Sequence, residues 1–302
     1  MQWGQIKTLF ILSFLLLDIY LLVLVVQKQD DIGTLDSSAI EEEQRFLEVE
    51  NISIPEDLPN TVPNESLMAI EPKTFNKEEI EEITSRENQE IIVVGDRYIN
   101  SLLEEPFAIP ENATSDDIAQ LLTSAVYLGN EYTFEYWDME RNILVFFQKK
   151  NERPIYYNQN GMLLVYLNDA NEVVGYTQTV LGDLEVINEE EVLEKPLSAI
   201  KELYNNNLLY TNDTVTEVKL GYHNFFPLES GRQVLVPTWK ITINDDRTRL
   251  VDGFERKVIP ENHDFLDNAL NTIVDNTILI RDNEEFKQNM LDLLSSKLEQ
   301  SE

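Results

Sequence analysis

The sequence has no cysteine among its 302 residues and only two histidines, His223 and His263. The lack of cysteine excludes a disulfide framework and thiolate chemistry. Neither histidine has a companion at metal-binding spacing, so we interpret both as ordinary surface or core residues. Basic residues are also scarce, with 23 Lys and Arg against 56 Asp and Glu, for a formal net charge of −33. So acidic a chain is a poor partner for nucleic acid or an anionic membrane surface.

Motifs for catalysis and cofactor binding are missing as well. The chain contains no Gly-x-Ser-x-Gly or His-Glu-x-x-His pattern and no glycine-rich phosphate loop. The stretch 168–172 lacks the twelve-residue frame of a calcium loop, so we interpret it as a hairpin turn. The acidic stretch 189–191 is interpreted as the solvated start of a helix. We therefore expect a protein without enzymatic activity, metal or cofactor.

Long apolar runs are absent except for one, TLFILSFLLLDIYLLVLVV at residues 8–26. At about 1.5 Å per residue it spans roughly 28 Å, which is close to the hydrocarbon thickness of a bilayer. It lacks the short apolar core and small-residue cleavage site of a secretory signal peptide, so we predict an uncleaved transmembrane helix. The short N-terminus and the acidic remainder predict a cytoplasmic tip at residues 1–7 and an extracellular bulk.

The apolar run carries a carboxyl group at its centre, Asp18. Insertion tolerates it, because one central Asp costs about 2.5 to 3.5 kcal/mol while each Leu, Ile, Val or Phe contributes about −0.3 to −0.6 kcal/mol. Its helical neighbours offer no hydrogen bond; they are Phe14, Leu15, Leu21 and Leu22. One interpretation is a protonated Asp18 bonded to its own backbone. The other is a hydrogen bond to a second transmembrane helix, with these five residues as the partner-binding face.

Composition divides the rest of the chain into four parts. Residues 27–65 carry clustered acids and three prolines, which predicts an acidic extracellular stalk. Residues 66–187 and 188–260 each show a helix followed by alternating strands, which predicts two α+β units with antiparallel sheets. Residues 261–302 return to helical spacing and predict a helical C-terminal extension. That extension either packs on its own domain or offers a helix to a partner protein.

Several elements are specific enough to predict individually. NKEEIEEITSRENQ predicts a helix capped by Asn76, and SDDIAQLLTSAVYL predicts one capped by Thr114 or Ser115. MLLVYL and EVVGYTQTVL predict a hairpin across the turn NDAN. EEEVLEKPLSAIKELYNNNLL predicts a helix with Pro196 near the start of its main stretch. No strict alternation of strands and helices occurs, so a doubly wound sheet is not expected.

Three stretches resemble the YycH/YycI family, and in particular its YycI members. The first is the N-terminal block MQWGQIKTLFILSFLLLDIYLL, with Trp3, the Lys7-Thr8 step and the embedded Asp18. The others are MLLVYLNDANEVVGYTQT, similar to the paired central strands of the family, and VPTWKITIN with RLVDGFERKVI, similar to its C-terminal strands. The resemblance covers most of residues 1–260. It departs at the turn 252–256, where a small Thr-Gly-type hairpin is expected, and at residues 261–302, which extend beyond the family pattern.

The resemblance implies a function that none of these motifs shows by itself. The family consists of single-pass accessory proteins of the WalK/WalR (YycG/YycF) two-component system of low-GC Gram-positive bacteria. It implies an outward domain paired with a YycH-like protein. It also implies contact with the sensor histidine kinase WalK, partly through transmembrane helices, that adjusts kinase activity and cell-wall metabolism.

Two other classes of function remain open at this stage. The extracellular part could be a binding module that senses a wall fragment, a peptide or a cation, with the transmembrane helix as a mere tether. It could also be a wall hydrolase or a protease inhibitor. The first alternative predicts that exchanging the anchor helix is harmless, whereas a kinase regulator that works through its helix loses its effect.

Overall fold

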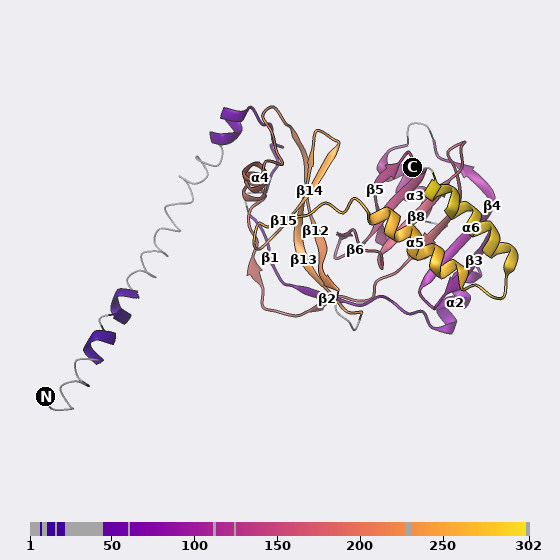
Figure 1. Cartoon of the computed structure of the whole chain (residues 1–302), viewed down its shortest axis with the longest axis horizontal. Helices are drawn as coiled ribbons and strands as arrows, with labels where there is room; N and C mark the ends of the chain where they lie inside the picture. Colours follow the sequence, from indigo (N-terminus) through magenta and orange to yellow (C-terminus); the bar gives the residue numbers. More distant parts are fainter. Residues whose placement is uncertain are drawn as a thin grey trace.

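The computed structural model describes most of the chain as two units joined side by side (Figure 1). The described residues are 7, 11–15, 17–21, 45–59, 61–110, 113–123, 125–227 and 231–299. Over these residues the fold is mixed α+β and rich in sheet, as the sequence predicts. Most strand pairs are antiparallel, which agrees with a fold built from hairpins.

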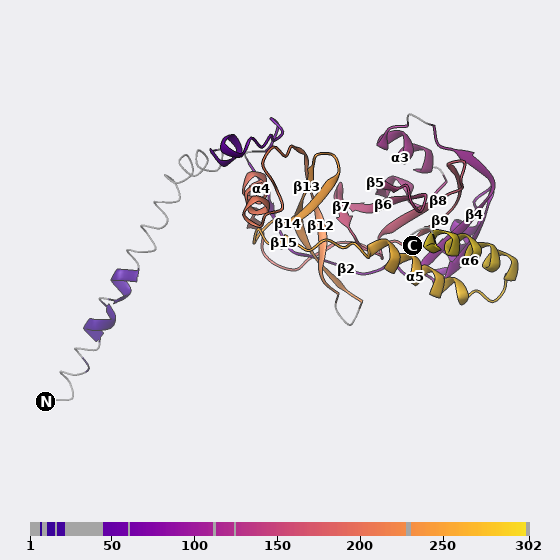
Figure 2. The ribbon, with the colours of Figure 1, turned by 45° about the horizontal axis from the view of Figure 1, so that its top comes forward.

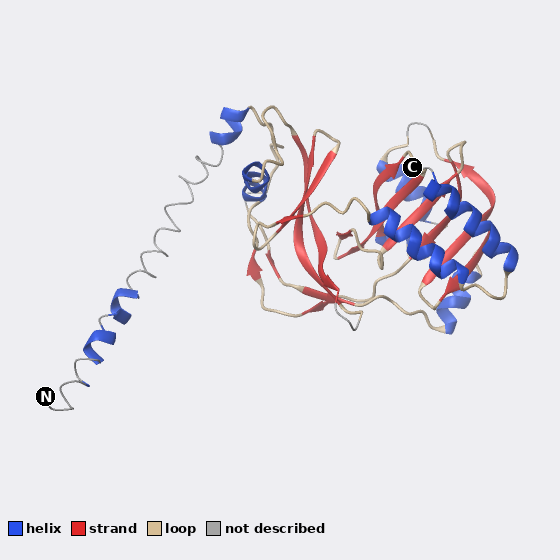
Figure 3. Ribbon diagram, in the orientation of Figure 1, coloured by secondary structure: helices blue, strands red, loops and turns tan. Residues whose placement is uncertain are grey.

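The first unit is a three-layer sandwich around a six-stranded antiparallel sheet. In spatial order its strands are β5 (Tyr132–Asp138), β6 (Ile143–Lys150), β8 (Met162–Leu167), β9 (Glu172–Gln178), β4 (Tyr98–Ala108) and β3 (Gln89–Val94). Helices α2 (Lys77–Thr84) and α3 (Ser115–Thr123) cover one face, and the short η1 (Gly129–Glu131) precedes β5. Helices α5 (Phe265–Ile278) and α6 (Glu284–Glu299) cover the other face (Figure 3). Because both faces are covered, MLLVYL is apolar and buried throughout rather than alternating.

The second unit is a twisted sheet with one helix against it. Its long strands are β12 (Val215–Pro227), β13 (Gln233–Ile243) and β14 (Arg247–Asp252), extended by β15 (Val258–Ile259), β2 (Met68–Ile70) and β10 (Glu185–Val186). A separate two-stranded sheet joins β1 (Asn64–Glu65) to β11 (Glu191–Val192). Helix α4 (Pro196–Asn205) packs on the face that carries Trp239, Ile241 and Ile243. Pro196 occupies the first turn of α4, where a missing N–H is harmless.

One short strand, β7 (Arg153–Tyr156), joins the sheets of the two units (Figure 2). It pairs antiparallel with the end of β6 through Pro154 and Arg153. On its other side it pairs parallel with β12, Ile155 opposite Tyr222 and Tyr156 opposite His223. The continuous sheet therefore narrows to two residue pairs on each side of β7.

One predicted helix start is wrong: residues 189–191 do not begin a helix, because Glu191–Val192 pairs with β1 as β11 and α4 begins only at Pro196. Two other predicted helix starts are confirmed by their hydrogen bonds. Asn76 and Glu79 form a reciprocal capping box, with each side chain accepting from the backbone N–H of the other. Thr114 and Asp117 do the same at the start of α3. The predicted hairpin between residues 162 and 178 is also confirmed, as β8 paired with β9.

The second half of the expected stalk differs from the prediction. Residues 45–50 are helical, and Leu47 and Ile52 are 7% and 6% exposed in a hydrophobic cluster with α4 and β13. Although this stretch is acidic, it has an apolar face. That face packs against α4, which lies about 150 residues later in the chain. Likewise, β2 lies in the second unit, because Met68–Ile70 pairs with β13 rather than with its neighbours in sequence.

The C-terminal extension completes the core of the first unit. Its helices bury a row of apolar side chains against β6 and β8: Phe265, Leu266, Leu270, Ile273, Phe286, Met290 and Leu294. Of the two interpretations left open by the sequence, packing on its own domain is the one that these contacts support. Figure 2 shows α5 and α6 side by side along one face of the sheet.

The apolar run 8–26 lies only partly within the described residues. Residues 11–15 and 17–21 are helical there, and their side chains are exposed. Among the described residues, no helix has the length and apolar character needed to span a membrane. The expected transmembrane helix therefore stays a prediction.

Candidate functional site

A cavity of about 540 Å³ lies between the two units. Glu135 and Tyr136 of β5 and Tyr157 after β7 form its wall on the first unit. The pocket-facing side of the second unit comprises β12, β13, β14 and the segment that leads into α5. The cavity falls within the range of volumes typical of ligand pockets and, like many of them, lies between two folded units. We therefore take it as the candidate site.

A buried ion pair crosses this cavity from one unit to the other. The Nζ atom of Lys240 on β13 lies 2.5 Å from Oε1 of Glu135 on β5. The two side chains are only 9% and 6% exposed, so both charges depend on each other for their stabilisation. The same Nζ atom lies 5.5 Å from the ring centroid of Tyr156, within cation–π distance.

Three buried polar atoms around the cavity have no hydrogen-bond partner. They are Nδ1 of His223, Nε of Arg249 and the hydroxyl of Tyr156. Arg249 uses another nitrogen, Nη1, in an ion pair of 2.7 Å with Glu261, whose second oxygen lies 3.3 Å from Nε2 of His263. Because buried polar groups in folded proteins are nearly always paired, these three atoms are available to bind water or a ligand.

His223 is held neutral by its surroundings. Burial lowers its pKa to about 4, because desolvation disfavours the charged imidazolium. The neighbouring tyrosine Tyr157 is affected in the opposite direction: burial raises its pKa to about 12. Among the described residues no group of three or more His, Cys, Asp or Glu side chains is placed to hold a metal ion. The cavity therefore offers mixed hydrogen-bonding groups around one internal ion pair.

The buried His223 predicts a specific loss of stability in acid. An unfolded histidine titrates near pH 6.5, so the unfolded state binds a proton below that pH. In the folded state His223 binds this proton only near pH 4, so the unfolded state is favoured between these values. Stability is therefore lost as the pH falls from 6.5 to 4, by at most roughly 3 kcal/mol for this group. The measurement is the free energy of unfolding by urea at several pH values, for the wild type and for His223→Gln.

The control for this prediction is His263→Gln, because His263 is 78% exposed. We expect the wild type and His263→Gln to lose stability in parallel between pH 6.5 and 4. His223→Gln should show a shallower decline, since it lacks the buried imidazole. Identical slopes for His223→Gln and the wild type would contradict the burial of a neutral imidazole.

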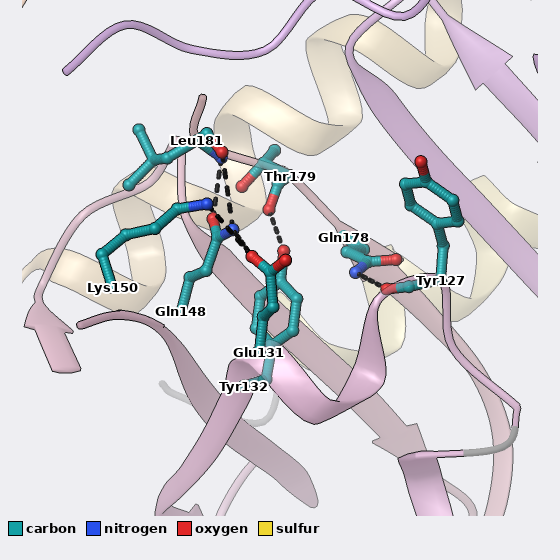
Figure 4. A network of polar contacts seen from close by, with 8 residues as sticks. All are labelled: Tyr127, Glu131, Tyr132, Gln148, Lys150, Gln178, Thr179 and Leu181. Atoms are coloured by element: carbon teal, nitrogen blue, oxygen red, sulfur yellow. Dashed lines mark hydrogen bonds and ion pairs between the residues drawn. The ribbon is translucent and has the colours of Figure 1, made fainter. Parts of the chain in front are cut away.

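A second polar cluster, inside the first unit, serves the fold (Figure 4). The Gln148 side chain accepts from the backbone N–H of Leu181 at 2.7 Å and donates to Glu131 at 2.8 Å. The hydroxyl of Tyr132 donates to the carbonyl of Thr179 at 2.6 Å, and burial raises the pKa of this tyrosine. These groups pair with one another and tie η1 to the chain after β9. We interpret the cluster as a structural network.

The residues predicted from the sequence lie apart from the cavity. Asp18, Phe14, Leu15 and Leu21 belong to the described helical stretches at the N-terminus, where they are exposed, and Leu22 lies outside the described residues. Whether the five form a partner-binding face stays a prediction. The sequence analysis missed Glu135 and Lys240, which lie 105 positions apart. Only the register of β12, β13 and β7 brings them together, so no local pattern could reveal them.

Comparison with known proteins identifies the family of this chain. The family model described as "YycI protein" matches residues 27–254. A search of curated proteins finds no match. Among solved structures, an uncharacterized protein from Eubacterium rectale has a TM-score of 0.43 and 9% identity, over 70% of this chain and 91% of its own. Because the family match covers well over half of its length, the chain belongs to the YycI family, a regulatory accessory family associated with the WalK (YycG) system.

Proposed function

We propose that this protein is a non-catalytic, membrane-anchored regulator that modulates the sensor histidine kinase WalK together with a YycH-like protein. The observation that carries the proposal is the family match at residues 27–254, which begins directly after the apolar run 8–26. In this arrangement the N-terminus is cytoplasmic, the helix spans the cell membrane and the bulk of the chain is extracellular. Signalling then works by population shift, limited by the regulator's differential affinity for the two states of the kinase.

The anchor helix is the proposed recognition element. Asp18 stands among apolar side chains that remain half or more exposed, Phe14 at 60% and Leu15 at 56%. In hydrocarbon a lone carboxyl group is unfavourable, and a hydrogen bond to another transmembrane helix would stabilise it by about 1 kcal/mol. Intramembrane acids are rare enough to be treated as functional by default.

The second unit is the part of the molecule to which the anchor is attached. Glu50 accepts hydrogen bonds from the Tyr204 hydroxyl at 2.8 Å and the Thr211 hydroxyl at 2.5 Å, and these two bonds lower its pKa, Thr211 contributing most. The Phe46 ring also lies 5.2 Å from that of Tyr204. Only residues 27–44 then separate the anchor from this unit. Fully extended, these residues would span at most roughly 60 Å. This attachment would place the second unit nearer the membrane.

Co-purification from membranes tests the proposal. We compare the wild type with Asp18→Leu, Asp18→Asn and a chain whose residues 8–26 are exchanged for an unrelated transmembrane helix. The kinase should be recovered with the wild type, be lost with the exchanged helix and fall several-fold with Asp18→Leu. Asp18→Asn should retain most of it, because an amide can still make an interhelical hydrogen bond.

The matched control is Tyr20→Leu, which also removes a polar group from the run but leaves Asp18 in place. It should recover the kinase as the wild type does. Full recovery with Asp18→Leu would reduce Asp18 to a tolerated residue. Full recovery with the exchanged helix as well would contradict the proposed recognition through the membrane and move it to the extracellular part.

A second candidate function is supported by the cavity between the units. A pocket of about 540 Å³ with several polar groups is large enough for a small ligand, which fits an extracellular sensing module. The same exchanged-helix chain discriminates between the two functions. A sensing module with a mere tether keeps its signalling effect on the kinase after the exchange, whereas the helix-dependent regulator loses it.

A further inference from the structure

The junction between the two units is built narrowly. Its only sheet contact among the described residues runs through β7, where Ile155 and Tyr156 pair with Tyr222 and His223. We call these two residue pairs the β7–β12 seam. Two ladder pairs give far less resistance to bending than the eleven pairs that join β12 to β13 within the second unit. The seam is therefore the place where the sheet can flex with the smallest loss of hydrogen bonds.

The two sides of the seam differ in character. Successive side chains on a strand point to opposite faces, so Ile155 and Tyr222 lie on one side and Tyr156 and His223 on the other. The first side is apolar and well packed, with Met68, Ile70, Leu181 and Leu235 completing a buried cluster. The buried Asn158 side chain also donates to Gln233 of β13 at 2.6 Å. This side holds the units together as a hinge would.

The other side contains the cavity, which is lined by polar and apolar groups, and Leu250 and Ile259 of the second unit pack there against the core of the first unit. Its contacts between the units include the Lys240–Glu135 ion pair, which joins a strand of each unit. Around it lie the three orphaned atoms, on His223, Arg249 and Tyr156. Each of these atoms lacks a hydrogen bond in the closed arrangement and would gain one from water if the cavity opened.

We propose that the two units open and close about the β7–β12 seam, with the Lys240–Glu135 ion pair as the latch of the closed state. The latch favours closure, while the orphaned polar atoms favour opening. These opposing effects lie at the same junction, so the balance between the two states is set there. The extracellular part is thus a two-state element on which a partner or ligand can act. The motion itself does not depend on the kinase contact proposed above.

Distances between two spin labels test this proposal in the full-length chain in detergent micelles. Because the chain has no native cysteine, Met139→Cys and Asp246→Cys provide unique labelling positions. Met139 is 77% exposed in the first unit, and Asp246 is exposed at the β13–β14 turn of the second. The labelled protein should show a closed population and a more distant, open one. No kinase is present, so the result stands whatever the co-purification shows.

Two variants should shift these populations in opposite directions. Glu135→Gln weakens the latch, and we expect at least a twofold rise in the open fraction. Tyr156→Phe removes an orphaned hydroxyl while keeping the ring, and we expect at least a twofold fall. The control Glu152→Gln breaks an exposed ion pair within the first unit, with Lys149 at 3.5 Å, and should leave both populations unchanged.

Cooperative thermal unfolding, followed by circular dichroism, verifies that each variant is folded. If Glu135→Gln does not fold, Tyr156→Phe decides the question alone, because it preserves the packing of a fully buried ring. A single narrow distance distribution shared by the wild type and Tyr156→Phe would overturn the proposal. So would a shift of equal size in Glu152→Gln.

Discussion

A chain that ends at residue 260 is expected to lose the cooperative folding of its first unit. Helices α5 and α6 bury seven large apolar side chains on the sheet, and five of them have no exposed surface. The seven are Phe265, Leu266, Leu270, Ile273, Phe286, Met290 and Leu294, and all but Phe265 and Leu266 are 0% exposed. At about 1.5 to 3 kcal/mol for each, their loss exceeds roughly 10 kcal/mol. Domains are stable by only about 5 to 15 kcal/mol, so the truncated unit should not hold a fixed core.

Near-ultraviolet circular dichroism and binding of a hydrophobic dye measure this outcome. The truncated chain should lose its aromatic near-ultraviolet signal and bind the dye, as compact states without fixed packing do. A chain that ends at residue 299 is the matched control, since it keeps both helices and should behave as the full chain. A truncated chain with an unchanged melting transition would show that the helices are dispensable, despite their burial. The folded unit would then coincide with the family match, which ends at residue 254.

Phe147→Ala is expected to have the largest effect of any single substitution proposed for this protein. Phe147 is fully buried on β6, and its ring makes edge contacts with Tyr156 at 6.4 Å, Tyr157 at 5.3 Å and Phe265 at 5.6 Å. It therefore links three segments, β6, the end of β7 and the start of α5. Truncating a buried Phe costs about 3 to 5 kcal/mol, through lost apolar burial and the cavity left behind.

Urea unfolding at neutral pH measures this loss. Met139→Ala is the control, because the Met139 side chain is 77% exposed and its removal should change the free energy of unfolding by less than about 0.5 kcal/mol. A loss below about 1 kcal/mol for Phe147→Ala would mean that the surrounding rings collapse into the space. Such a result would contradict the tight packing on which the aromatic cluster depends.

Local sequence determined two helix starts and one hairpin of this protein. Asn76 with Glu79 and Thr114 with Asp117 are capping patterns that need only three residues of context, and both form as predicted. The hairpin between residues 162 and 178 follows from two strand-like runs and a short turn. Even the departure from the family pattern at the turn 252–256 has a local reason. There the Asp252 carboxylate accepts the backbone N–H groups of Phe254 and Glu255.

The sequence also determined the family, because the family model matches residues 27–254 on sequence alone. It placed Asp18 at the centre of the apolar run 8–26 and thereby raised the hypothesis of a helix partner. Both inferences rest on patterns within one contiguous stretch of chain. Neither requires knowledge of which distant strands pair.

Tertiary structure alone decided how the units are assembled. The pairing of β2 with β13, the parallel pairing of β7 with β12 and the packing of residues 45–58 on α4 join segments far apart in sequence. The periodicity and composition of a sequence do not reveal such contacts, because the same strand pattern is compatible with many partner strands and registers. The Lys240–Glu135 latch exists only because those registers bring two distant side chains to 2.5 Å. The cavity and its hinge are therefore properties of the fold that no single stretch of the sequence encodes.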